Sequence, residues 1–552
     1  MKIILGINGG TKSGNQDSSA TIIKNGKIVA CVEEERFIRI KHAPGVLPEN
    51  AIKFCLKKAN VTIKDVDYVV FAGATYDNMK KILTDFFQLK FRFCPKIYLI
   101  DHHLAHASAA FYTSGFENSY IITADLSGDS RSTVLFYADK TGIKEINSYC
   151  KPNSLGLFYA TITQYLGFRY DNDECKTMAL AAYKSKNNCI INDFLNITEE
   201  DYKINKKYLN PNLQPGKPHP SRQEPLFNKY FLSKMNRQAR FENEKIDNFY
   251  LSVAKTAQDK IEQAFFALIK QLKSSKYKSE NLCLAGGVCL NAELNSKISY
   301  LNEFKQLFVQ PAASDAGLSL GGALYLSNKC KSLLPERINT VYLGDKFSNE
   351  EIKKELENVK INTYKYYETS KLSKIIAEKL AIGKIGAIFN GAMEYGPRAL
   401  GNRSILADPR NKKTKDILNK NFKQRELFQP FAPSVIKEYA KEYFDFPQTK
   451  SNFEFMIINV KVKENISNKI VSAIHVNNTA RIQIVDKKYN SFFYNIINEF
   501  GKKTGVYVLL NTSLNKRGLP IARTPNDALN VFFTTPMDFI VLGNYLIEKS
   551  FM

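Results

Sequence analysis

Histidines at helical spacing are the clearest chemical signal in the sequence. His102 and His106 lie one helical turn apart in the segment HHLAH, which contains three of the six histidines of the chain. Imidazoles at positions i and i+4 project from the same side of a helix. An apolar run over Ser119–Ala124 predicts a strand that ends just before Asp125, whose carboxylate could approach both rings. Two nitrogens and a carboxylate oxygen form a donor set for a metal ion.

The same histidine pattern has a simpler explanation that stays open. A helix N-terminus can carry histidines that bond only to the backbone, and the isolated pattern H-x-x-x-H fits this as well as a metal site. Asp101 precedes the first histidine, where it could orient a ligating imidazole. The concentration of half of all histidines in five residues favours the metal site.

A second acidic strand end occurs far along the chain. The segment FVQPAASDAGLSLGGALY predicts a strand, a turn and a helix of small residues, with Asp315 just beyond the strand. Open α/β sheets build their sites at the carboxyl ends of strands. We therefore predict Asp315 as the fourth metal ligand. Two such strand ends in separate parts of the chain also indicate two related halves of one ATPase core.

Glycine-rich turns follow two predicted strands. NLCLAGGVCLNAELN places Gly286 and Gly287 between a buried strand and a helix. Glycines there let a nucleotide approach the backbone, and the helix N-terminus offers free N–H groups to phosphate. The N-terminal segment KIILGINGGTKSGNQDSSATII predicts a strand, a polar turn and a hairpin, which is how actin-like ATPase folds begin. That second pattern is common to hairpins and carries little weight alone.

Arginines set among Gly, Pro, Asn and aromatic residues mark the C-terminal part. The densest polar motif, MEYGPRALGNRSILADPR, contains Arg398 and Arg403 in a loop after a predicted strand. Guanidinium groups bind phosphate and carboxylate oxygens through paired hydrogen bonds. These arginines predict an anion pocket. Later segments add further polar groups to it: Lys423, Arg425, Arg481, Asn511 and Arg517.

Composition is typical of a folded globular protein. Hydrophobic residues make up 44% of the 552 residues, and no apolar run approaches the ~20 residues that span a bilayer. The nine cysteines have no C-x-x-C spacing, and Met1-Lys2 leads directly into a predicted strand. We therefore expect reduced thiols, no membrane contact and a cytoplasmic location. The net charge of +24 comes mostly from scattered lysines without a nucleic-acid-binding motif, so we expect no nucleic-acid partner.

The length of the chain allows two large domains. Periodicity weakens over 186–240, where Asn, Lys, Pro and Gln accumulate, which predicts an insertion or a substrate-facing lid. A less regular stretch over 329–349 predicts a domain boundary. We expect an α/β protein with domains over 1–345 and 346–552.

A set of motifs in one order along the chain resembles the O-carbamoyltransferase family, which includes nodulation-factor, cephalosporin and tobramycin carbamoyltransferases. The motifs are QDSSATI, EEERFIRIKH, HHLAHASAAFY, SLGLFY, DECKTMALAAY, AGGVCLN, PAASDAGLSLGGAL, MEYGPRALGNRSILADPR, FKQRELFQPFAPSV, TARIQ and LLNTSLN. The resemblance implies an actin-like ATPase-superfamily domain, similar to the universal tRNA threonylcarbamoyl transferase. A YrdC-like α/β domain, similar to threonylcarbamoyl-adenylate synthases, is implied to follow it.

The resemblance also implies a two-step reaction. The YrdC-like domain of such enzymes makes carbamoyl-adenylate from carbamoyl phosphate and ATP, for which we expect Mg²⁺. The N-terminal domain then transfers the carbamoyl group to a hydroxyl of a small acceptor, here expected to be sugar-like. By resemblance, a metal ion, usually iron, is held by His102, His106, Asp125 and Asp315.

Roles for further residues follow from the same resemblance. Asp17, Arg398 and Lys423 are the implied catalytic residues. A nucleotide is expected in the N-terminal domain near Gly286, Gly287 and Asn291. The pocket for carbamoyl phosphate and ATP is expected to comprise Arg398, Arg403, Lys423, Arg425, Arg481, Asn511 and Arg517.

The first loop departs from the family pattern. Relatives carry a histidine just before the Asp-Ser/Ala-Ser motif, whereas this chain has Gln16 there, in a longer loop. If that histidine activates the acceptor hydroxyl, the acceptor itself or a water held by Asp17 could take its place. Two other functions stay open: a threonylcarbamoyl transferase that modifies tRNA, and a regulator that binds metal and nucleotide without catalysis.

Overall fold

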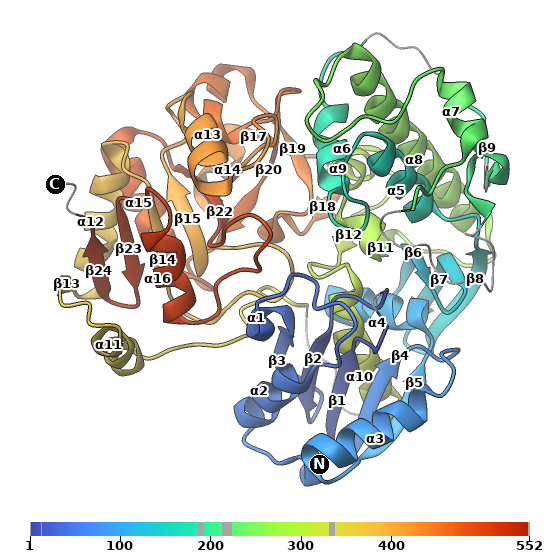
Figure 1. Ribbon diagram of the computed structural model, residues 1–552, viewed down its shortest axis with the longest axis horizontal. Helices are drawn as coiled ribbons and strands as arrows, with labels where there is room; N and C mark the ends of the chain where they lie inside the picture. The colour runs from blue at the N-terminus through green and yellow to red at the C-terminus, as the bar shows by residue number, and fades with distance from the viewer. Residues whose placement is uncertain (1, 13, 186–190, 212–223, 331–336, 550–552) are drawn as a thin grey trace.

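Two sheets of the same topology form the N-terminal part of the protein, and a larger sheet forms most of the C-terminal part (Figure 1). This computed structural model describes residues 2–12, 14–185, 191–211, 224–330 and 337–549. Helices pack on the sheets throughout, so the predicted α/β class is confirmed. Within the described residues, no helix is long and apolar enough to cross a membrane.

The first sheet has the strand order β3-β2-β1-β4-β5. β1 is antiparallel to β2 and parallel to β4, while β2–β3 is antiparallel and β4–β5 parallel. β1 is buried along its whole length, which fits its nearly continuous apolar sequence IILGIN. The strands are β1 (Ile3–Asn8), β2 (Ser19–Lys24), β3 (Lys27–Glu33), β4 (Tyr68–Ala72) and β5 (Lys96–Ile100).

The second sheet repeats this arrangement in the order β8-β7-β6-β11-β12, with β18 added at the β12 edge. β6–β7 and β7–β8 are antiparallel, whereas β6–β11 and β11–β12 are parallel. This repeat confirms the expected pair of related halves, which is the arrangement of an actin-like core. The strands are β6 (Ser119–Gly128), β7 (Arg131–Asp139), β8 (Gly142–Cys150), β11 (Asn281–Ala285) and β12 (Gln306–Val309).

Helices α4 (His102–Ser114) and α10 (Leu318–Lys329) join the two halves. α10 covers the first sheet, α4 covers the second, and the two helices pack against each other. They approach closely because α10 contains Gly321, where a Cβ would stand 1.8 Å from the carbonyl oxygen of Ala105. The long helix α8 (Asn248–Ser274) packs against α5 and α6. The other helices here are α1 (Glu35–Ile38), α2 (Glu49–Ala59), α3 (Met79–Phe91), α5 (Leu155–Tyr165), α6 (Glu174–Ala181), α7 (Lys229–Met235) and α9 (Ala292–Tyr300).

The C-terminal sheet has eight strands in the order β13-β24-β23-β14-β15-β22-β16-β21. Successive residues of β14 face opposite sides, since Ile388 packs in the cluster that contains α12 and α15 and Phe389 in the cluster that contains α11 and α16. Helices therefore cover both faces. The strands are β13 (Tyr364–Tyr366), β14 (Gly386–Phe389), β15 (Arg403–Ala407), β16 (Ala432–Ile436), β21 (Gln483–Val485), β22 (Val508–Ser513), β23 (Phe539–Leu542) and β24 (Tyr545–Glu548).

The remaining elements of the C-terminal part are helices and a small sheet in the order β17-β19-β20. The helices are α11 (Asn349–Asn358), α12 (Thr369–Ala381), α13 (Thr414–Ile417), α14 (Ala440–Tyr443), α15 (Ser491–Thr504) and α16 (Pro525–Phe533). The strands of the small sheet are β17 (Phe444–Asp445), β19 (Asn459–Val462) and β20 (Thr479–Arg481).

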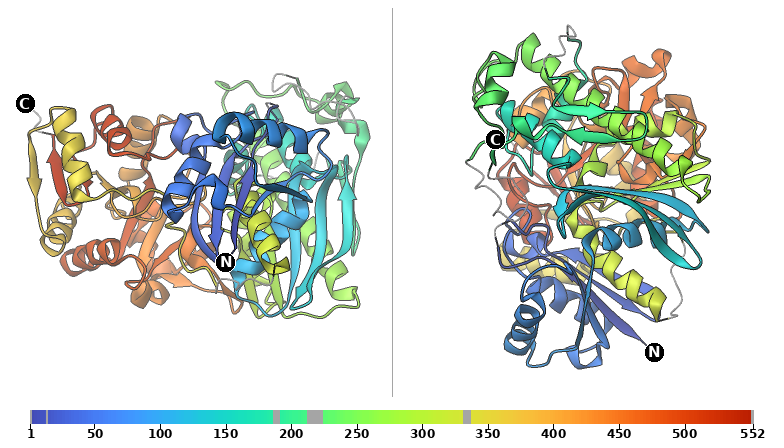
Figure 2. Two further views of the ribbon diagram at one scale, coloured as in Figure 1. Left: turned by 90° about the horizontal axis from the view of Figure 1, so that it is seen from below. Right: turned by 90° about the vertical axis from the view of Figure 1, so that its right-hand side faces the viewer.

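Strand β18 (Lys450–Ser451) ties the two parts of the chain together. It comes from the C-terminal part but pairs in parallel with β12 of the second sheet. The side-chain amide of Asn452 continues this pairing, because it donates to the carbonyl of Val309 (2.7 Å) and accepts from the N–H of Val309 (3.0 Å). Figures 1 and 2 show the two parts side by side along the long axis of the molecule.

The predicted insertion over 186–240 is described in part, because 186–190 and 212–223 lie outside the described residues. Its hairpin packs on the second sheet, where Tyr202 stacks on Tyr149 with the ring centroids 4.5 Å apart. This portion of the segment is therefore attached to the core. The hairpin strands are β9 (Leu195–Ile197) and β10 (Tyr202–Ile204).

Candidate metal centre and anion pocket

Two carboxylates hold the N-terminus of α4. Asp101 is the N-cap and accepts a hydrogen bond from the N–H of Leu104 (2.9 Å), while Asp129 accepts from the N–H of His102 (2.8 Å). These bonds fix the first turn, and helical spacing then turns His102 and His106 to the same side. Asp101 thus acts as the helix cap rather than on an imidazole.

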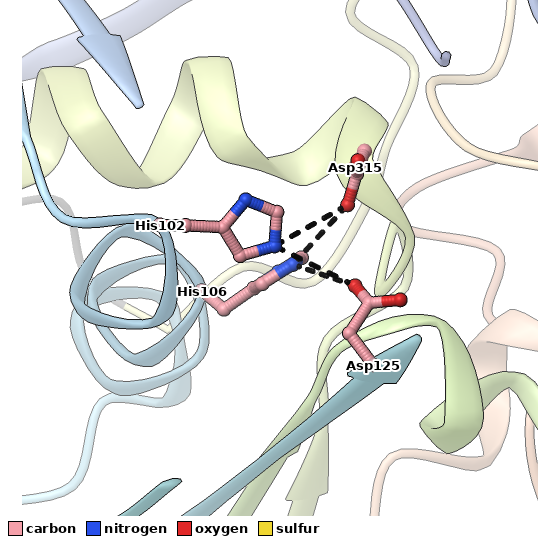
Figure 3. A group of neighbouring side chains, drawn as sticks. All are labelled: His102, His106, Asp125 and Asp315. Atoms are coloured by element: carbon pink, nitrogen blue, oxygen red, sulfur yellow. Dashed lines mark hydrogen bonds and ion pairs between the residues drawn. The ribbon is translucent and has the colours of Figure 1, made fainter. Parts of the chain in front are cut away.

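The four predicted metal ligands lie together where the two halves meet (Figure 3). Nε2 of His106 is 3.1 Å from Oδ2 of Asp125 and 3.5 Å from Oδ1 of Asp315. Nε2 of His102 is 3.7 Å and 3.6 Å from the same two oxygens. One donor atom from each residue lies within 4.8 Å of the others, a spacing that suits a single ion with metal–ligand bonds of about 2.0–2.2 Å.

Glycines allow the backbone to approach these ligands. Gly128, at the end of β6, packs against His102 so closely that a Cβ would stand 2.1 Å from Cγ of the ring. Gly287 lies next to Asp125, with a Cβ position 3.2 Å from Oδ1. A side chain at Gly128 would displace the His102 ring, so this glycine is needed for the geometry of the cluster.

The charges of the four side chains depend on one another. Burial lowers the pKa of His106, but hydrogen bonds to Asp125 and Asp315 outweigh it and raise that pKa to about 9. Burial raises the pKa of Asp125, but the neighbouring imidazoles of His102 and His106 hold it well below its usual range. The pKa of Asp315 is raised by burial and by the negative charge of Asp125. Two carboxylates crowded in this way favour a bound cation.

A divalent metal ion fits this donor set. Within the described residues, Nε2 of His102 is buried without a hydrogen-bond partner although it faces both carboxylates. Such a nitrogen costs free energy that a metal bond would recover. His103 is not one of the four clustered residues, and its Nδ1 bonds to Oγ1 of Thr123 (2.8 Å).

The predicted nucleotide turn lies beside the cluster. Gly286 has φ = 92°, and a Cβ there would stand 2.2 Å from the carbonyl oxygen of Ala124. The close contact with β6 therefore requires a glycine at this position, whether or not a ligand binds there. Asn291 caps α9 by accepting from the N–H of Leu294 (3.0 Å), and its amide donates to Gln258 of α8 (2.9 Å).

Asp17 lies in the loop between β1 and β2, next to the metal cluster. The side-chain amide of Asn8 donates to the main-chain carbonyls of Asp17 (3.2 Å) and Asp315 (3.0 Å), so one side chain links the two loops. Oδ1 of Asp17 is 2.7 Å from Nδ1 of His42. The sequence analysis missed His42, although the residue ends the motif EEERFIRIKH.

Arg398, Arg425 and Arg481 form a group of cations in the C-terminal part, hereafter the cation group. Burial lowers the pKa of each, that of Arg425 to about 10, and the charges of Arg398 and Arg425 lower the pKa of Arg481 further. In the part of the chain that the structure describes, the buried Nε atoms of Arg398 and Arg481 have no hydrogen-bond partner. The neighbouring Glu426 pairs with Lys176 of α6 (2.9 Å). Buried like charges of this kind favour an anionic ligand.

The side chains of Lys423 and Asn511, beside this group, form hydrogen bonds with other groups of the protein. Nζ of Lys423 donates to the main-chain carbonyl of Ser513 (2.5 Å) and to Oδ1 of Asn515 (2.8 Å), and burial together with Arg425 holds its pKa well below the usual range. The amide of Asn511 donates to Oγ of Ser434 (3.0 Å). Both residues therefore hold β22 and the turn that follows it in place.

Two predicted pocket residues are not members of the cation group. Arg403 is fully buried: its guanidinium lies 3.8 Å from the ring centroid of Phe389 and donates to the carbonyl of Asn390 (2.8 Å). Arg517 is exposed: it pairs with Glu242 (3.2 Å) and donates to the main-chain carbonyl of Gln424, the residue before Arg425 (3.2 Å). Arg403 is therefore committed to the interior of the sheet, whereas Arg517 lies on the surface next to the segment that carries Arg425.

Neighbours of the cation group that the sequence analysis missed include two titratable side chains and a thiol. Burial and the charges of Arg481 and Lys415 lower the pKa of His475 to about 3. Cys175 of α6 acts electrostatically on Arg398, so the N-terminal part contributes to the edge of the pocket. A single histidine, lysine or cysteine outside a spaced pattern gives no sequence signal of such a role.

Comparison with known families assigns the chain. The family description "Carbamoyltransferase N-terminus" matches residues 4–81 and 72–324, and "Carbamoyltransferase C-terminus" matches residues 377–549. The chain belongs to the carbamoyltransferase family. The metal cluster lies in the N-terminal match and the cation group in the C-terminal match of this carbamoyltransferase-family enzyme.

Several relatives match this carbamoyltransferase-family chain over most of its length. Nodulation protein NolNO of Sinorhizobium fredii is 34% identical, over 97% of this chain and 79% of its own. Nodulation protein NolO of Bradyrhizobium diazoefficiens is 34% identical, over 82% of this chain and 79% of its own. An uncharacterised protein of Methanocaldococcus jannaschii is 34% identical, over 99% of this chain and 100% of its own.

Solved structures are more distant. Component A of the (R)-2-hydroxyglutaryl-CoA dehydratase of Acidaminococcus fermentans aligns with a TM-score of 0.37 and 13% identity, over 60% of this chain and 100% of that protein. HypF of T. kodakarensis aligns with a TM-score of 0.34 and 11% identity, over 61% of this chain and 48% of that protein. The actin-like assignment rests on the repeated strand order, not on these scores.

Proposed function

We propose that this chain is an ATP-dependent O-carbamoyltransferase with two half-reactions on one polypeptide. The C-terminal, YrdC-like part would convert carbamoyl phosphate, ATP and water to carbamoyl-adenylate, phosphate and pyrophosphate. The N-terminal part would then transfer the carbamoyl group to a hydroxyl of a small, sugar-like acceptor and release AMP. The family assignment supports the transferred group, and the two sites support the division of labour.

The cation group carries this proposal. Burial lowers the pKa of all three arginines, Arg398 and Arg425 lower that of Arg481 further, and within the described residues two of their buried Nε atoms have no hydrogen-bond partner. Carbamoyl phosphate and the Mg²⁺-bound triphosphate of ATP both present several anionic oxygens, which guanidinium groups bind in pairs. Binding both substrates there would bring the reacting atoms together and stabilise the charge that develops between them.

The metal cluster supports the transfer step. His102, His106, Asp125 and Asp315 would hold a divalent ion, for which we propose iron, and the ion would supply Lewis-acid polarisation of the carbamoyl carbonyl. The turn at Gly287 adjoins Asp125, so a nucleotide held there would present its carbamoyl group to the cluster.

Release of phosphate and pyrophosphate from ATP plus carbamoyl phosphate tests the division of labour. We expect the wild type to release both without any acceptor. Arg398→Ala should lose this release because it removes one of the three crowded cations, whereas His102→Ala should keep it. Arg237→Ala is the matched control, since Arg237 pairs with Asp247 on the surface of the N-terminal part. Absence of pyrophosphate release in the wild type would contradict the proposal and favour a non-catalytic regulator.

A further inference from the structure

His42 lies between Asp17 and Asn172, whose side chains determine the protonation of its two ring nitrogens. Its Nδ1 is 2.7 Å from Oδ1 of Asp17 and its Nε2 is 3.0 Å from Oδ1 of Asn172. Oδ1 of Asn172 also accepts from Nζ of Lys41 (2.8 Å), while the amide nitrogen of Asn172 donates to Asp173 (3.3 Å). The amide orientation is therefore set by its other partners. Both ring nitrogens of His42 face acceptors, so the ring is an imidazolium paired with the carboxylate of Asp17.

The backbone holds this pair in a strained conformation. Asp17, His42 and Ala43 have φ values of 53°, 65° and 40°, in the left-handed region that side chains other than glycine rarely adopt. The N–H of Asp17 donates to the carbonyl of His42 (2.7 Å), and the N–H of His42 donates to Glu35 (2.6 Å). Such strain persists where surrounding contacts impose it, and strained residues cluster at functional sites.

Three segments bring this pair to the metal cluster. Asn8 joins the loop of Asp17 to that of Asp315, and the hydroxyl of Ser314, the residue before Asp315, bonds to the Asp17 side chain. Asn172 comes from the loop before α6, the helix that carries Lys176 to the boundary with Glu426. The pair therefore lies on the N-terminal side of the route between the two sites.

We propose that Asp17 accepts the proton of the acceptor hydroxyl and that His42 and Asn172 are the positioning residues that hold it ready. This inference rests on the proposed carbamoyl transfer. In the step, the hydroxyl O–H bond breaks and its proton moves to Oδ2 of Asp17. The hydroxyl oxygen forms a bond to the carbamoyl carbon, and the bond from that carbon to the phosphate oxygen breaks to release AMP. The imidazolium of His42 supplies a positive charge next to Asp17, which the neutral side chain of Gln16 cannot supply.

The electrostatics agree with this assignment. Burial raises the pKa of Asp17, but His42 outweighs this and lowers it below its ordinary value. Burial lowers the pKa of His42, but Asp17 outweighs this and raises it. The other charged groups that face the pair are Lys41, which lowers the pKa of His42, and Glu35, which raises it. From the other loops the pair meets the neutral groups of Asn172 and Ser314.

Nitrogen-15 NMR of the histidine side chains tests the assignment without any acceptor. The full chain has six histidines, and His42→Gln identifies the signals of His42. We expect both ring nitrogens to be protonated at pH 7, with a titration above that of an ordinary histidine, and we expect this titration to move to lower pH in Asp17→Asn. A neutral His42 at pH 7, or a titration unchanged in Asp17→Asn, would overturn the proposal. In Asn172→Ala, the Nε2 shift alone should move strongly.

The pH profile of AMP release separates charge positioning from a merely structural role. ATP and carbamoyl phosphate are supplied, with water and added glycerol as hydroxyl probes. In His42→Gln the pKa of Asp17 should rise, so activity should be lost at a higher pH on the acidic side, by about one unit or more. His42→Lys should restore part of this shift, and Lys53→Gln, which removes an exposed ion pair with Glu49, should change nothing. An acidic limb that stays in place in both His42 variants would overturn the proposal.

Pyrophosphate–ATP exchange distinguishes the two levels of inference. Asp17 and His42 variants should keep the exchange, because it occurs at the C-terminal site. Loss of exchange in the wild type would contradict the proposed function itself. If the wild type exchanges pyrophosphate but releases no AMP with these probes, the NMR titration decides, with the outcomes stated above.

Discussion

Burial opposes the charge of each of the three arginines in the cation group. Arg481 has the most extreme situation, since two neighbouring guanidinium groups also oppose its charge. Proteins tolerate such a conflict where a ligand relieves it, and they lose stability in its absence. The ligand-free protein is therefore expected to be less stable than a variant with fewer charges.

Replacing Arg481 with Met should separate stability from binding. We expect the free energy of unfolding to rise by about 1 kcal/mol, because a crowded charge is removed. ATP should bind about tenfold more weakly or worse, because a hydrogen bond to a charged group contributes about 1.5–3 kcal/mol. Urea denaturation and calorimetric titration with ATP measure the two effects. Lower stability together with unchanged ATP affinity would show that Arg481 is a structural residue.

Glu174, at the start of α6, is a second buried group whose charge should lower stability, and its effect should depend on pH. Burial and the charge of Asp171 raise its pKa to about 7. The folded state therefore disfavours the ionised form, and the contribution of this group to stability is lost as pH rises from about 4.5, its unfolded value, through 7. Glu174→Gln keeps an acceptor for the N–H of Asp171 but cannot ionise. We expect it to raise Tm at pH 8 and to leave Tm nearly unchanged at pH 5; equal effects at both values would contradict this.

Contacts between elements explain why the metal ligands converge. α4 carries both histidines, Asp125 lies within β6 three residues before its end at Gly128, and the turn before α10 carries Asp315. Backbone contacts at glycines let these elements approach: Gly128 admits the His102 ring and Gly321 admits the backbone of α4. The ligand geometry is thus a property of element packing as much as of the four residues.

Gly128→Ala should weaken metal binding while leaving the fold intact. The added Cβ would stand 2.1 Å from the His102 ring, so the imidazole must turn away from the two carboxylates. We expect the affinity for Fe²⁺ to fall about 10–100-fold, as for changes that disturb ligand orientation. Anaerobic titration followed by metal analysis measures it, with circular dichroism to check folding. Gly14→Ala is the control, because nothing lies within 4 Å of its Cβ position; equal iron binding in both variants would contradict the prediction.

Side-chain directions could be predicted from the sequence where a local pattern determines them. They could not be predicted where packing between elements determines them. A spacing of four residues on a helix turns His102 and His106 to one side, and the parallel strands β6 and β12 bring Asp125 and Asp315 to one edge of the sheet. The predicted end of the strand before Asp125 was wrong, because β6 runs on to Gly128. Arg398 and Arg403 stand five residues apart in one motif, yet only the latter begins a buried strand and turns inward. The motif shows that both residues are arginines, whereas their positions relative to the buried strand decide which of them turns inward and which joins the cation group.

At the scale of the whole molecule, one ion pair links the surroundings of the two sites. Nζ of Lys176 is 2.9 Å from Glu426, beside Arg425, and 3.1 Å from Asp173, beside Asn172. Lys176 is buried, so it connects the loop of the proposed proton acceptor with the loop of the cation group. Carbamoyl-adenylate is labile in water, and we expect a closed passage between the parts.

Lys176→Gln should open that passage. Removing the ammonium group leaves Glu426 without its partner at the boundary, which is more costly than removing an exposed pair. We expect several-fold more carbamoyl-adenylate in the protein-free filtrate, trapped as hydroxyurea with hydroxylamine. Lys53→Gln should behave like the wild type. Escape at the full rate of turnover from the wild type would show that no closed passage exists.

The strand β18 affects how such proteins can be recombined. β18 and Asn452 of the C-terminal part complete the edge of the second N-terminal sheet at β12 and Val309. In a chimera made by exchanging only the residues before the predicted boundary, the sheet and the strand that completes it would therefore come from different proteins. An exchange intended to change acceptor choice must therefore transplant the strand and its asparagine together with the sheet that they complete.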